Sequence, residues 1–298
     1  MTKKSVCIVG CGNLGKRHLE GLSKSGNIKE VYLVDPSLDN LVAAEKLNRN
    51  SNLRIIKTDS LERVPNELDL AIIATQADVR RQVLETLLSS KNVKCLILEK
   101  IVFSKITDFE PINKILLKKG VKCEVNFVRR KVPFYQHLKS LLTDEKTLKI
   151  SVSGINWGLA SNSVHFLDLL LFLGGENCFF SMTSKSQLNI KNSKRDNCVE
   201  LLGHLNFDGP NSILELSSDA GSNEFHKIVI QSENYKIEID EINGSARIFN
   251  ASGEVSKESF NFAFQSDLTG AVVDEFFMSD TGGLTAYSDA IEVHRLFF

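Results

Sequence analysis

Residues 6–15 read VCIVGCGNLG, an apolar run that leads directly into a glycine-rich turn of the form G-x-G-x-x-G. Such a run is typical of a buried strand, and the periodic apolar residues that follow are typical of a helix that begins in the turn. In this context the first glycine permits a tight turn, the second lets a diphosphate approach the backbone, and the third lets the helix pack closely on the strand. The amides that open the helix would then face the phosphates. The stretch therefore predicts dinucleotide binding by Gly10, Gly12, Asn13, Leu14 and Gly15.

A carboxylate follows the second apolar run, where a ligand of the adenosine ribose is expected. Residues 31–34 are apolar, and Asp35 comes directly after them, twenty residues beyond Gly15. A carboxylate at this position would accept hydrogen bonds from both ribose hydroxyls and would repel a 2′-phosphate. The sequence therefore predicts NAD as the cofactor in preference to NADP.

Short apolar runs alternate with helical segments up to residue 127. This alternation is typical of a parallel sheet that is buried on both faces. Thr107 and Glu110 have the spacing of a capping box at the start of a helix that Gly120 would end. We therefore predict that residues 1–127 form a doubly wound α/β domain of about six strands, at residues 6–9, 31–34, 53–56, 68–74, 95–98 and 122–127.

The pattern changes beyond residue 127 and predicts an α+β domain over residues 128–298. Glu233-Asn234 and Asn243-Gly244 are typical hairpin turns, so the sheet should be largely antiparallel. Alternating isoleucines before and after the first turn indicate one covered and one open face. Residues 181–197, rich in Ser, Lys and Asn, are predicted as a loop. Predicted helices lie at residues 134–142, 164–173 and 284–298, the last closing this domain, and strands at residues 148–155, 198–207, 212–216, 226–231, 235–239 and 246–249.

Composition and charge narrow the class of protein. The 298 residues allow about two domains of roughly 150 residues each, and 36 basic against 37 acidic residues provide no broad cationic field for nucleic acid or anionic lipid. The longest apolar segments fall well short of the ~20 residues that cross a bilayer, and the first is too short for a signal peptide. Six cysteines without CxxC spacing argue against a zinc site or a disulfide framework. We expect a cytoplasmic protein without a metal, a nucleic-acid partner or a membrane partner.

At this point the chain resembles the glucose-fructose oxidoreductase, inositol dehydrogenase and MocA (Gfo/Idh/MocA) family. The motifs that carry the resemblance span nearly the whole chain in the family's order: the glycine loop with Arg17-His18, then Ala74-Thr75, Glu99-Lys100, Asn126, and His165-Phe-Leu-Asp168. The resemblance implies a Rossmann domain, then an open-faced sheet domain, with the active site between them. It also implies that Lys100 and His165 face the nicotinamide. The carboxyl ends of parallel strands line the ligand crevice of such folds, which independently places Thr75, Glu99, Lys100 and Asn126 there.

The predicted activity is NAD-dependent hydride transfer at a secondary hydroxyl or keto group of a sugar, nucleotide-sugar or cyclitol. Oxidation of a secondary alcohol needs a base for the hydroxyl proton and a group that stabilises the developing alkoxide. We assign His165 as the general acid/base and Lys100 as the hydroxyl-binding cation or proton relay, and the reverse assignment stays open. Asp168 and Asn162 are candidate supporting residues. The alternatives are a non-catalytic dinucleotide-binding sensor or scaffold of the same fold, and an imine or tetrapyrrole reductase.

Four further expectations concern departures from the family pattern, the partners of the chain and His18. Ile101 stands where relatives usually have proline, so the local backbone is expected to differ if that proline forms a cis bond. Ser161 stands where many relatives have an aspartate, so His165 is expected to be oriented by hydrogen bonds alone, without a carboxylate. The open sheet face is expected to be apolar and to pair with a second subunit, giving a homo-oligomer that binds a polyhydroxylated small molecule. His18 is expected to pack or cap near the phosphates.

Overall fold

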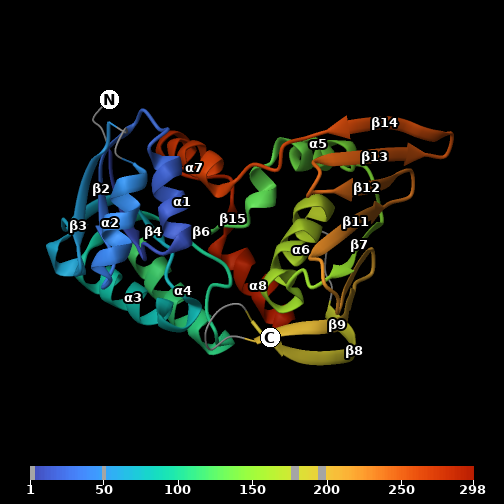
Figure 1. The fold of residues 1–298 in the computed structure, drawn as a ribbon, viewed down its shortest axis with the longest axis horizontal. Helices are drawn as coiled ribbons and strands as arrows, with labels where there is room; N and C mark the ends of the chain where they lie inside the picture. Colours follow the sequence, from blue (N-terminus) through green and yellow to red (C-terminus); the bar gives the residue numbers. More distant parts are fainter. Residues whose placement is uncertain (1–3, 49–51, 176–180, 194–198) are drawn as a thin grey trace. The chain divides into compact units, whose positions relative to one another are not determined.

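The chain divides into two compact units, each with its own sheet (Figure 1). The computed structural model describes residues 4–48, 52–175, 181–193 and 199–298. The first unit contains the described residues up to Lys131 together with Ala263–Leu296, and the second contains Val132–Phe262. This differs from the sequence prediction, which placed the C-terminal segment and its closing helix in the second domain.

A parallel sheet forms the centre of the first unit. Within the described residues it has seven strands in the order β15-β6-β5-β4-β1-β2-β3, and all neighbours are parallel except β15, which pairs antiparallel with β6. The order 3-2-1-4-5-6 is that of the doubly wound dinucleotide-binding fold, as the sequence predicted. The bounds are β1 (Lys4–Val9), β2 (Ile28–Val34), β3 (Arg54–Thr58), β4 (Glu67–Ile73), β5 (Asn92–Leu98), β6 (Lys122–Val125) and β15 (Thr285–Ala286).

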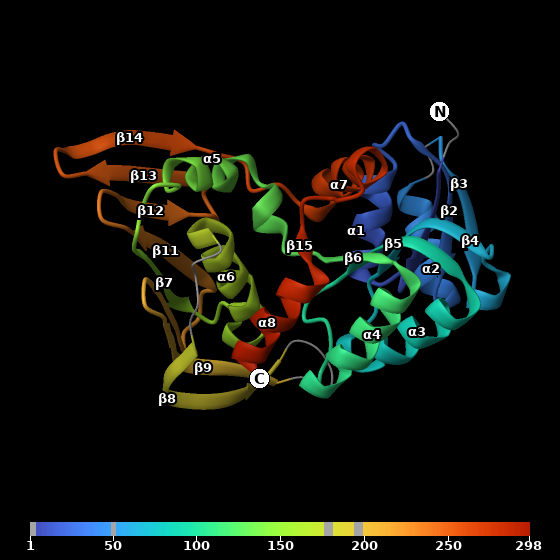
Figure 2. The same ribbon diagram turned by 180° about the vertical axis from the view of Figure 1, so that it is seen from behind.

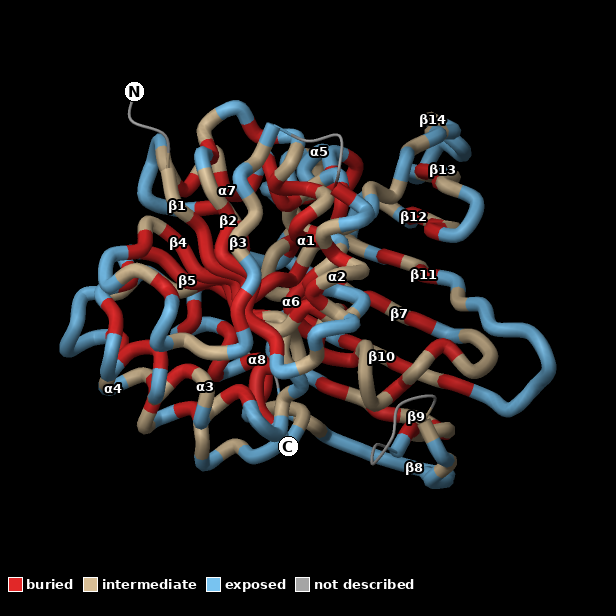
Figure 3. The backbone as a smooth tube through the Cα atoms, turned by 60° about the vertical axis from the view of Figure 1, so that its left-hand side comes forward, coloured by how far each residue is buried: buried red, intermediate tan, exposed pale blue. Residues whose placement is uncertain are grey.

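Helices cover both faces of this sheet, which buries strands β1, β4 and β5 along most of their length (Figure 3). Helices α1 (Asn13–Leu22), α2 (Leu38–Leu47) and α7 (Gln265–Ser279) lie together, and α3 (Ala77–Ser90) and α4 (Phe109–Lys119) lie together on the opposite face (Figures 1 and 2). The predicted capping box is wrong: α4 follows the 3-10 turn η2 (Ile106–Asp108), and Asp108 is its N-cap without a side-chain bond. Gly120 does end α4, at φ 65°. The other elements are α8 (Tyr287–Phe297), η1 (Leu61–Arg63) and η3 (Val128–Lys131).

Helix α7 packs against α1 at two glycines, which explains why the C-terminal segment belongs to the first unit. A Cβ on Gly270 would lie 2.6 Å from the carbonyl oxygen of Gly21, and a Cβ on Gly21 would lie 2.7 Å from the Cβ of Thr269. At one end of this contact Asp274 accepts a 2.5 Å hydrogen bond from the Ser25 hydroxyl. The two helices therefore approach at a distance that only residues without a side chain allow.

The second unit contains a largely antiparallel sheet, as predicted. Among the described residues it has eight strands in the order β14-β13-β12-β11-β7-β10-β9-β8, and β7 and β10 are the parallel pair. Residues 181–192 form the exposed edge strand β8, so the predicted loop is wrong there, and residues 194–197 lie outside the described residues. The bounds are β7 (Leu148–Ile155), β8 (Ser181–Asn192), β9 (Val199–Asp208), β10 (Ser212–Asp219), β11 (Phe225–Gln231), β12 (Lys236–Asp240), β13 (Ser245–Asn250), β14 (Gly253–Ser259), α5 (Pro133–Leu141) and α6 (Leu159–Gly174).

The two faces of this second sheet differ in chemistry. Helix α6 packs on β7, β9 and β10, and the alternating isoleucines form buried cross-strand pairs, Ile228 with Ile239 and Ile230 with Ile237. The outward face instead carries ion pairs such as Lys149–Glu215, with 2.6 Å between nitrogen and oxygen. The expectation of an apolar open face is therefore wrong, because the alternation places the isoleucines on the covered side.

None of the helices in the described residues is both long and apolar enough to cross a membrane.

Gly270→Ala should destabilise the first unit, although alanine is ordinarily the better helix former. The added methyl group would lie 2.6 Å from a backbone oxygen of α1, and overpacking of this kind costs about 1–3 kcal/mol. Urea unfolding measures the loss of stability, and Gly26→Ala, where an added Cβ would meet no described atom within 4 Å, is the control. Equal stability of the Gly270 variant and wild type would contradict the close helix contact.

Candidate functional site

Most of the predicted cofactor residues come together at the carboxyl edge of the first sheet. Gly10, Ala74, Glu99 and Asn126 each follow a strand and donate their N–H to the last residue of a neighbouring strand, at 2.8–3.2 Å. The hydrogen-bond ladder thus continues one residue beyond the strand ends. This continuation fixes the backbone of four segments at the edge where folds of this type bind ligands.

The glycine loop is built by close packing at two of its three glycines. Gly10 has φ +93°, and a Cβ there would lie 2.8 Å from the backbone of Ala74 and Thr75. A Cβ on Gly15 would lie 1.9 Å from the carbonyl oxygen of Gly10. A Cβ on Gly12, by contrast, would have no described atom within 4 Å. Gly10 and Gly15 are therefore required by the fold itself, whereas Gly12 borders open space.

The first helix presents its N-terminus at this open space. Helix α1 begins at Asn13 with Gly12 as N-cap, and among the described residues no side chain caps it and no acidic side chain lies in its first turn. The first amides of a helix have no acceptor within the helix, and they carry a partial positive charge. The arrangement suits an anion such as a phosphate.

Asp35 connects the second strand to the glycine loop. This residue is only 6% exposed. Its Oδ2 accepts a 2.6 Å hydrogen bond from the amide of Cys11, and its Oδ1 accepts one of 2.8 Å from the amide of Ser37. Asn40 Nδ2 also donates to both oxygens, at the longer distances of 3.3 and 3.4 Å. A carboxylate has about four acceptor positions, so a ligand hydroxyl would bind Asp35 in place of the Asn40 amide. Asp39, in the first turn of α2, adds a second negative charge to this segment.

A closed ring of side-chain hydrogen bonds joins the strand ends to helix α7. Glu99 Oε1 lies 2.9 Å from His18 Nε2 and accepts a 2.5 Å hydrogen bond from Asn126 Nδ2. The same Asn126 nitrogen donates to Gln265 Oε1 at 2.7 Å, and Gln265 Nε2 donates to Thr269 Oγ1 at 2.9 Å. Thr269 Oγ1 lies 3.0 Å from His18 Nδ1, which closes the ring. His18 is thus a partner of Glu99, a role that the sequence analysis did not predict.

The ring keeps the buried Glu99 carboxylate in its charged form. Burial alone would raise the pKa of Glu99, but the hydrogen bond and positive charge of His18, the hydrogen bond from Asn126 and the charge of Arg80 outweigh it and lower the pKa. Gln265 and Thr269 belong to α7, a helix that the sequence analysis did not predict. The sequence pattern does not identify these two residues as members of the site.

Arg80 holds the backbone on both sides of Lys100. Its guanidinium is buried, and Nη1 donates to the carbonyl oxygens of Glu99, Ile101 and Val102 at 2.5, 2.6 and 2.8 Å. Nη2 donates to the carbonyl oxygen of Thr75 at the end of β4. The Lys100–Ile101 peptide bond is cis. Sequence analysis missed Arg80 because an arginine in a surface helix gives no sign that it points inward.

His294, from the C-terminal helix α8, holds the segment after Lys100. Its Nδ1 lies 2.6 Å from the carbonyl oxygen of Ala290, and its Nε2 accepts a 3.2 Å hydrogen bond from the amide of Val102. Burial, together with the charges of Arg80 and Lys100, lowers the pKa of His294 to about 4, although the Ala290 carbonyl opposes this shift. The imidazole is therefore neutral at pH 7, with its proton on Nδ1.

The remaining predicted site residues belong to the second unit. His165 and Asp168 lie on α6, where His165 is partly exposed and Asp168 is fully buried. Asn162 Nδ2 donates to the carbonyl oxygen of Trp157 at 2.8 Å, so this side chain holds the turn before α6. Lys100 and His165 thus come from different units.

A carboxylate stands beside the start of α6, where it contacts Ser161. Glu200, on β9, is buried and accepts a 2.8 Å hydrogen bond from the Ser161 hydroxyl. Its other oxygen accepts hydrogen bonds from the amides of Ala160 and Ser161. The sequence could not show it, because Glu200 is distant from α6 along the chain.

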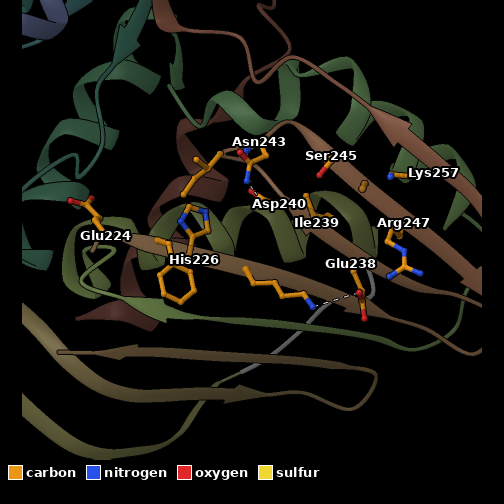
Figure 4. Close-up of a pocket in the computed structure, with 13 residues that line it drawn as sticks. Glu224, His226, Glu238, Ile239, Asp240, Asn243, Ser245, Arg247 and Lys257 are labelled. Atoms are coloured by element: carbon orange, nitrogen blue, oxygen red, sulfur yellow. Dashed lines mark hydrogen bonds and ion pairs between the residues drawn. The ribbon is translucent and has the colours of Figure 1, made fainter. Parts of the chain in front are cut away.

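A separate hollow of about 760 Å³ lies on the second sheet, between β11 and β14 (Figure 4). It is lined by both signs of charge, among them Lys227, Glu238 and Arg247, and Lys227 lies 3.5 Å from Glu238. His226 lies at its edge and pairs with Glu241 at 3.0 Å. The lining contains none of the site residues predicted from the sequence.

Across the described ranges, no three His, Cys, Asp or Glu side chains gather as a metal site.

Comparison with known proteins classifies residues 4–127, the N-terminal part of the first unit. Residues 4–127 match the model of the Gfo/Idh/MocA oxidoreductase family, NAD-binding Rossmann fold. This region is a Gfo/Idh/MocA Rossmann domain. The resemblance seen in the sequence is thereby confirmed. No curated protein matches the sequence.

Solved structures share the fold over the full length of the chain. UDP-N-acetylglucosamine 3-dehydrogenase from Acidithiobacillus ferrooxidans is 14% identical, with a TM-score of 0.74 over 100% of this chain and 95% of that one. A 3-ketoreductase from Actinomadura kijaniata, solved with NADP, is 10% identical with a TM-score of 0.75 over 99% and 96%. A super-repressor mutant of Gal80p from Saccharomyces cerevisiae is 16% identical with a TM-score of 0.76 over 99% and 94%. At these identities the likeness concerns the fold.

Acidification should destabilise the protein through His294 before the carboxylates titrate. The pKa of this histidine is about 4 in the folded state and about 6.5 when unfolded, so the unfolded chain binds the extra proton first. Its contribution is fully present above pH 6.5 and is lost as the pH falls towards 4, by up to roughly 3 kcal/mol. Urea unfolding from pH 7 to 4 measures this loss. His294→Gln should show a flatter dependence over the same window, and an unchanged slope would refute the assignment.

Proposed function

We propose that this protein is an NAD-dependent oxidoreductase that acts on a secondary hydroxyl or keto group of a sugar, nucleotide-sugar or cyclitol. The observation that carries the proposal is the uncapped N-terminus of α1 beside the Asp35 carboxylate, on a domain of an NAD-binding oxidoreductase family. UDP-N-acetylglucosamine 3-dehydrogenase, which shares the fold, supports a nucleotide-sugar substrate, and the 3-ketoreductase of the same fold supports reaction at a keto group.

The residues present fit a dinucleotide. Open space faces Gly12, and the first-turn amides of α1 supply donors for a diphosphate. The buried hydroxyl of Thr75 has no hydrogen-bond partner in the part of the chain that the structure describes, so a ligand could satisfy it. We assign Asn13 and Leu14 to the diphosphate and Thr75, Glu99 and Asn126 to the surroundings of the nicotinamide. When bound, the cofactor supplies the hydride donor or acceptor.

The proposed preference for NAD over NADP rests on charge. Asp35 already accepts two backbone hydrogen bonds, which hold its oxygens in place, and Asp39 lies one turn further along. The segment from residue 36 to residue 41 contains no lysine or arginine that could bind a 2′-phosphate. A phosphate on the ribose would therefore meet negative charge without a compensating cation.

We assign the proton chemistry to Lys100 and His165. Arg80 and His294 fix the backbone that carries Lys100, so its amine is presented from a rigid segment. In the oxidative direction His165 accepts the hydroxyl proton, and Lys100 stabilises the alkoxide oxygen or relays the proton. The exchange of these two roles remains an alternative, and Asp168 and Asn162 are assigned as supports of His165.

Lys100→Met and His165→Ala should each slow a single enzyme-bound hydride transfer by about 10²-fold or more, because each removes a group needed for proton transfer. A panel of sugars, nucleotide-sugars and cyclitols, screened by NADH formation, provides the substrate for rapid-mixing kinetics. Both variants should still bind NADH. Matched controls are Lys105→Met and His137→Ala, which remove the same groups at exposed positions.

The outcomes separate the proposed enzyme from its alternative. Full activity in either variant would remove that residue from the mechanism. If wild type binds NADH tightly but turns over no member of the panel in either direction, the chain is better described as a dinucleotide-binding sensor or scaffold. The likeness to the super-repressor mutant of Gal80p concerns the fold and leaves that alternative to the experiment.

We also propose that the chain forms a homo-oligomer through the outward face of its second sheet and acts in the cytoplasm. That face presents lysines and glutamates on neighbouring strands, for example Lys149–Glu215 and Lys236–Glu238. In an interface with twofold symmetry, such a surface can place each positive charge opposite a negative one of the second copy.

Light scattering at micromolar concentration should show a dimer or larger assembly. Lys227→Glu, which places like charges beside Glu238, should shift it towards monomer, whereas Lys46→Glu on the first unit should not. A monomeric wild type would contradict the proposed interface.

A further inference from the structure

We propose that Thr269 and Gln265 of α7 are positioning residues that hold His18 in its doubly protonated form, so that the carboxylate of Glu99, next to Lys100 in the chain, is neutralised. The proposal rests on the proposed role of Lys100 for its functional consequence, but its structural part stands on the ring alone. It assigns to α7 a role that neither the family match nor the fold comparison provides.

The direction of each hydrogen bond in the ring follows from its chemistry. The amide nitrogens of Asn126 and Gln265 can only donate, so Gln265 Nε2 donates to Thr269 Oγ1. The hydroxyl of Thr269 also lies 2.9 Å from the carbonyl oxygen of Gln265, four residues earlier on the same helix. A threonine in a helix commonly donates its one proton to that carbonyl. The Thr269 hydroxyl oxygen can then only accept a hydrogen bond from His18 Nδ1.

His18 must therefore donate from both ring nitrogens. Nδ1 lies 3.0 Å from Thr269 Oγ1, whose proton is donated to the Gln265 carbonyl oxygen, and Nε2 lies 2.9 Å from the Glu99 carboxylate. Only the imidazolium form carries a proton on both nitrogens. His18 and Glu99 are 1% and 4% exposed, so a charged pair is the arrangement that avoids an isolated buried charge.

The charge on His18 matters because Glu99 precedes Lys100. With His18 protonated, the pair carries no net charge. If His18 became neutral, the buried carboxylate would add an uncompensated negative charge one residue from Lys100, which would favour the ammonium form of the lysine. Arg80 from α3 and His294 from α8 also hold this segment, through hydrogen bonds with its backbone.

The first test is the protonation of His18 in the full-length protein without cofactor. Nitrogen NMR of the histidine rings, with His18 assigned by comparison with His18→Gln, should show both ring nitrogens protonated at pH 7. Thr269→Val removes the acceptor of Nδ1 and should convert the signal to that of a neutral ring, whereas Thr269→Ser should retain the wild-type signal. A neutral His18 in wild type would overturn the proposal without any variant.

A matched control exists in the same C-terminal segment. Thr281 donates its hydroxyl to the buried carboxylate of Glu124 at 2.6 Å, so Thr281→Val removes a comparable hydrogen bond away from the ring. This variant should leave the His18 signal unchanged. A change of equal size in both variants would mean that loosening of the C-terminal segment, and not the ring, sets the state of His18.

The second test is the pH profile of the hydride-transfer step. In Thr269→Val, the limb of the profile that reports deprotonation of Lys100 should shift to higher pH by about 1–2 units. Thr281→Val and Thr269→Ser should leave this limb in place. An unmoved limb in Thr269→Val, with His18 neutral, would overturn the positioning role. If wild type catalyses no transfer, the proposed function fails, and the NMR result still decides whether α7 fixes the charge of His18.

Discussion

Helix α1 starts in direct contact with the turn that follows strand β1, and the geometry of the rest of the site depends on this contact. Without a Cβ at Gly15, the helix can start directly against the carbonyl of Gly10. That contact directs the first-turn amides of α1 into the space beside Gly12, and the bond from Cys11 to Asp35 places a carboxylate at the edge of the same space. A positive helix end and an oriented acceptor thus arise from backbone geometry, before any catalytic side chain is considered.

The C-terminal segment completes the first unit. After the chain has formed the second unit it returns at residue 263 and places α7 against α1 and β15 against β6. Three of its side chains reach the strand ends: Gln265 and Thr269 through the hydrogen-bonded ring, and His294 through the amide of Val102. The buried Glu124 carboxylate binds the same segment through the amides of Gly282 and Leu284. The segment around Lys100 is therefore held by side chains from both the N-terminal and the C-terminal parts of the chain.

Sequence patterns predicted the parts of the fold that a local signal defines. Apolar runs marked β1, β2, β4 and β5, because burial on both faces leaves little choice of residue. Strands β3 and β6 were predicted from shorter apolar stretches, although only Thr58 of β3 and Glu124 and Val125 of β6 are buried. The polar edge strand β8 was missed because an exposed edge carries no apolar alternation. Helix α7 was missed although Val272, Val273 and Phe276 form a buried stripe at helical spacing, a signal that the sequence analysis did not use. Arg80 and Glu200 were missed for a different reason: their hydrogen-bond partners are distant in sequence, so only the folded chain shows their role.

Calorimetric titration of NADH and NADPH into the protein shows whether the N-terminus of α1 and Asp35 bind NAD, as we propose. We expect saturable binding of NADH at one site per chain, with weaker binding of NADPH. We also expect that Gly12→Val abolishes binding without changing the unfolding midpoint, because the valine side chain would enter the open space. Absence of NADH binding, or tighter binding of NADPH, would rule out this site.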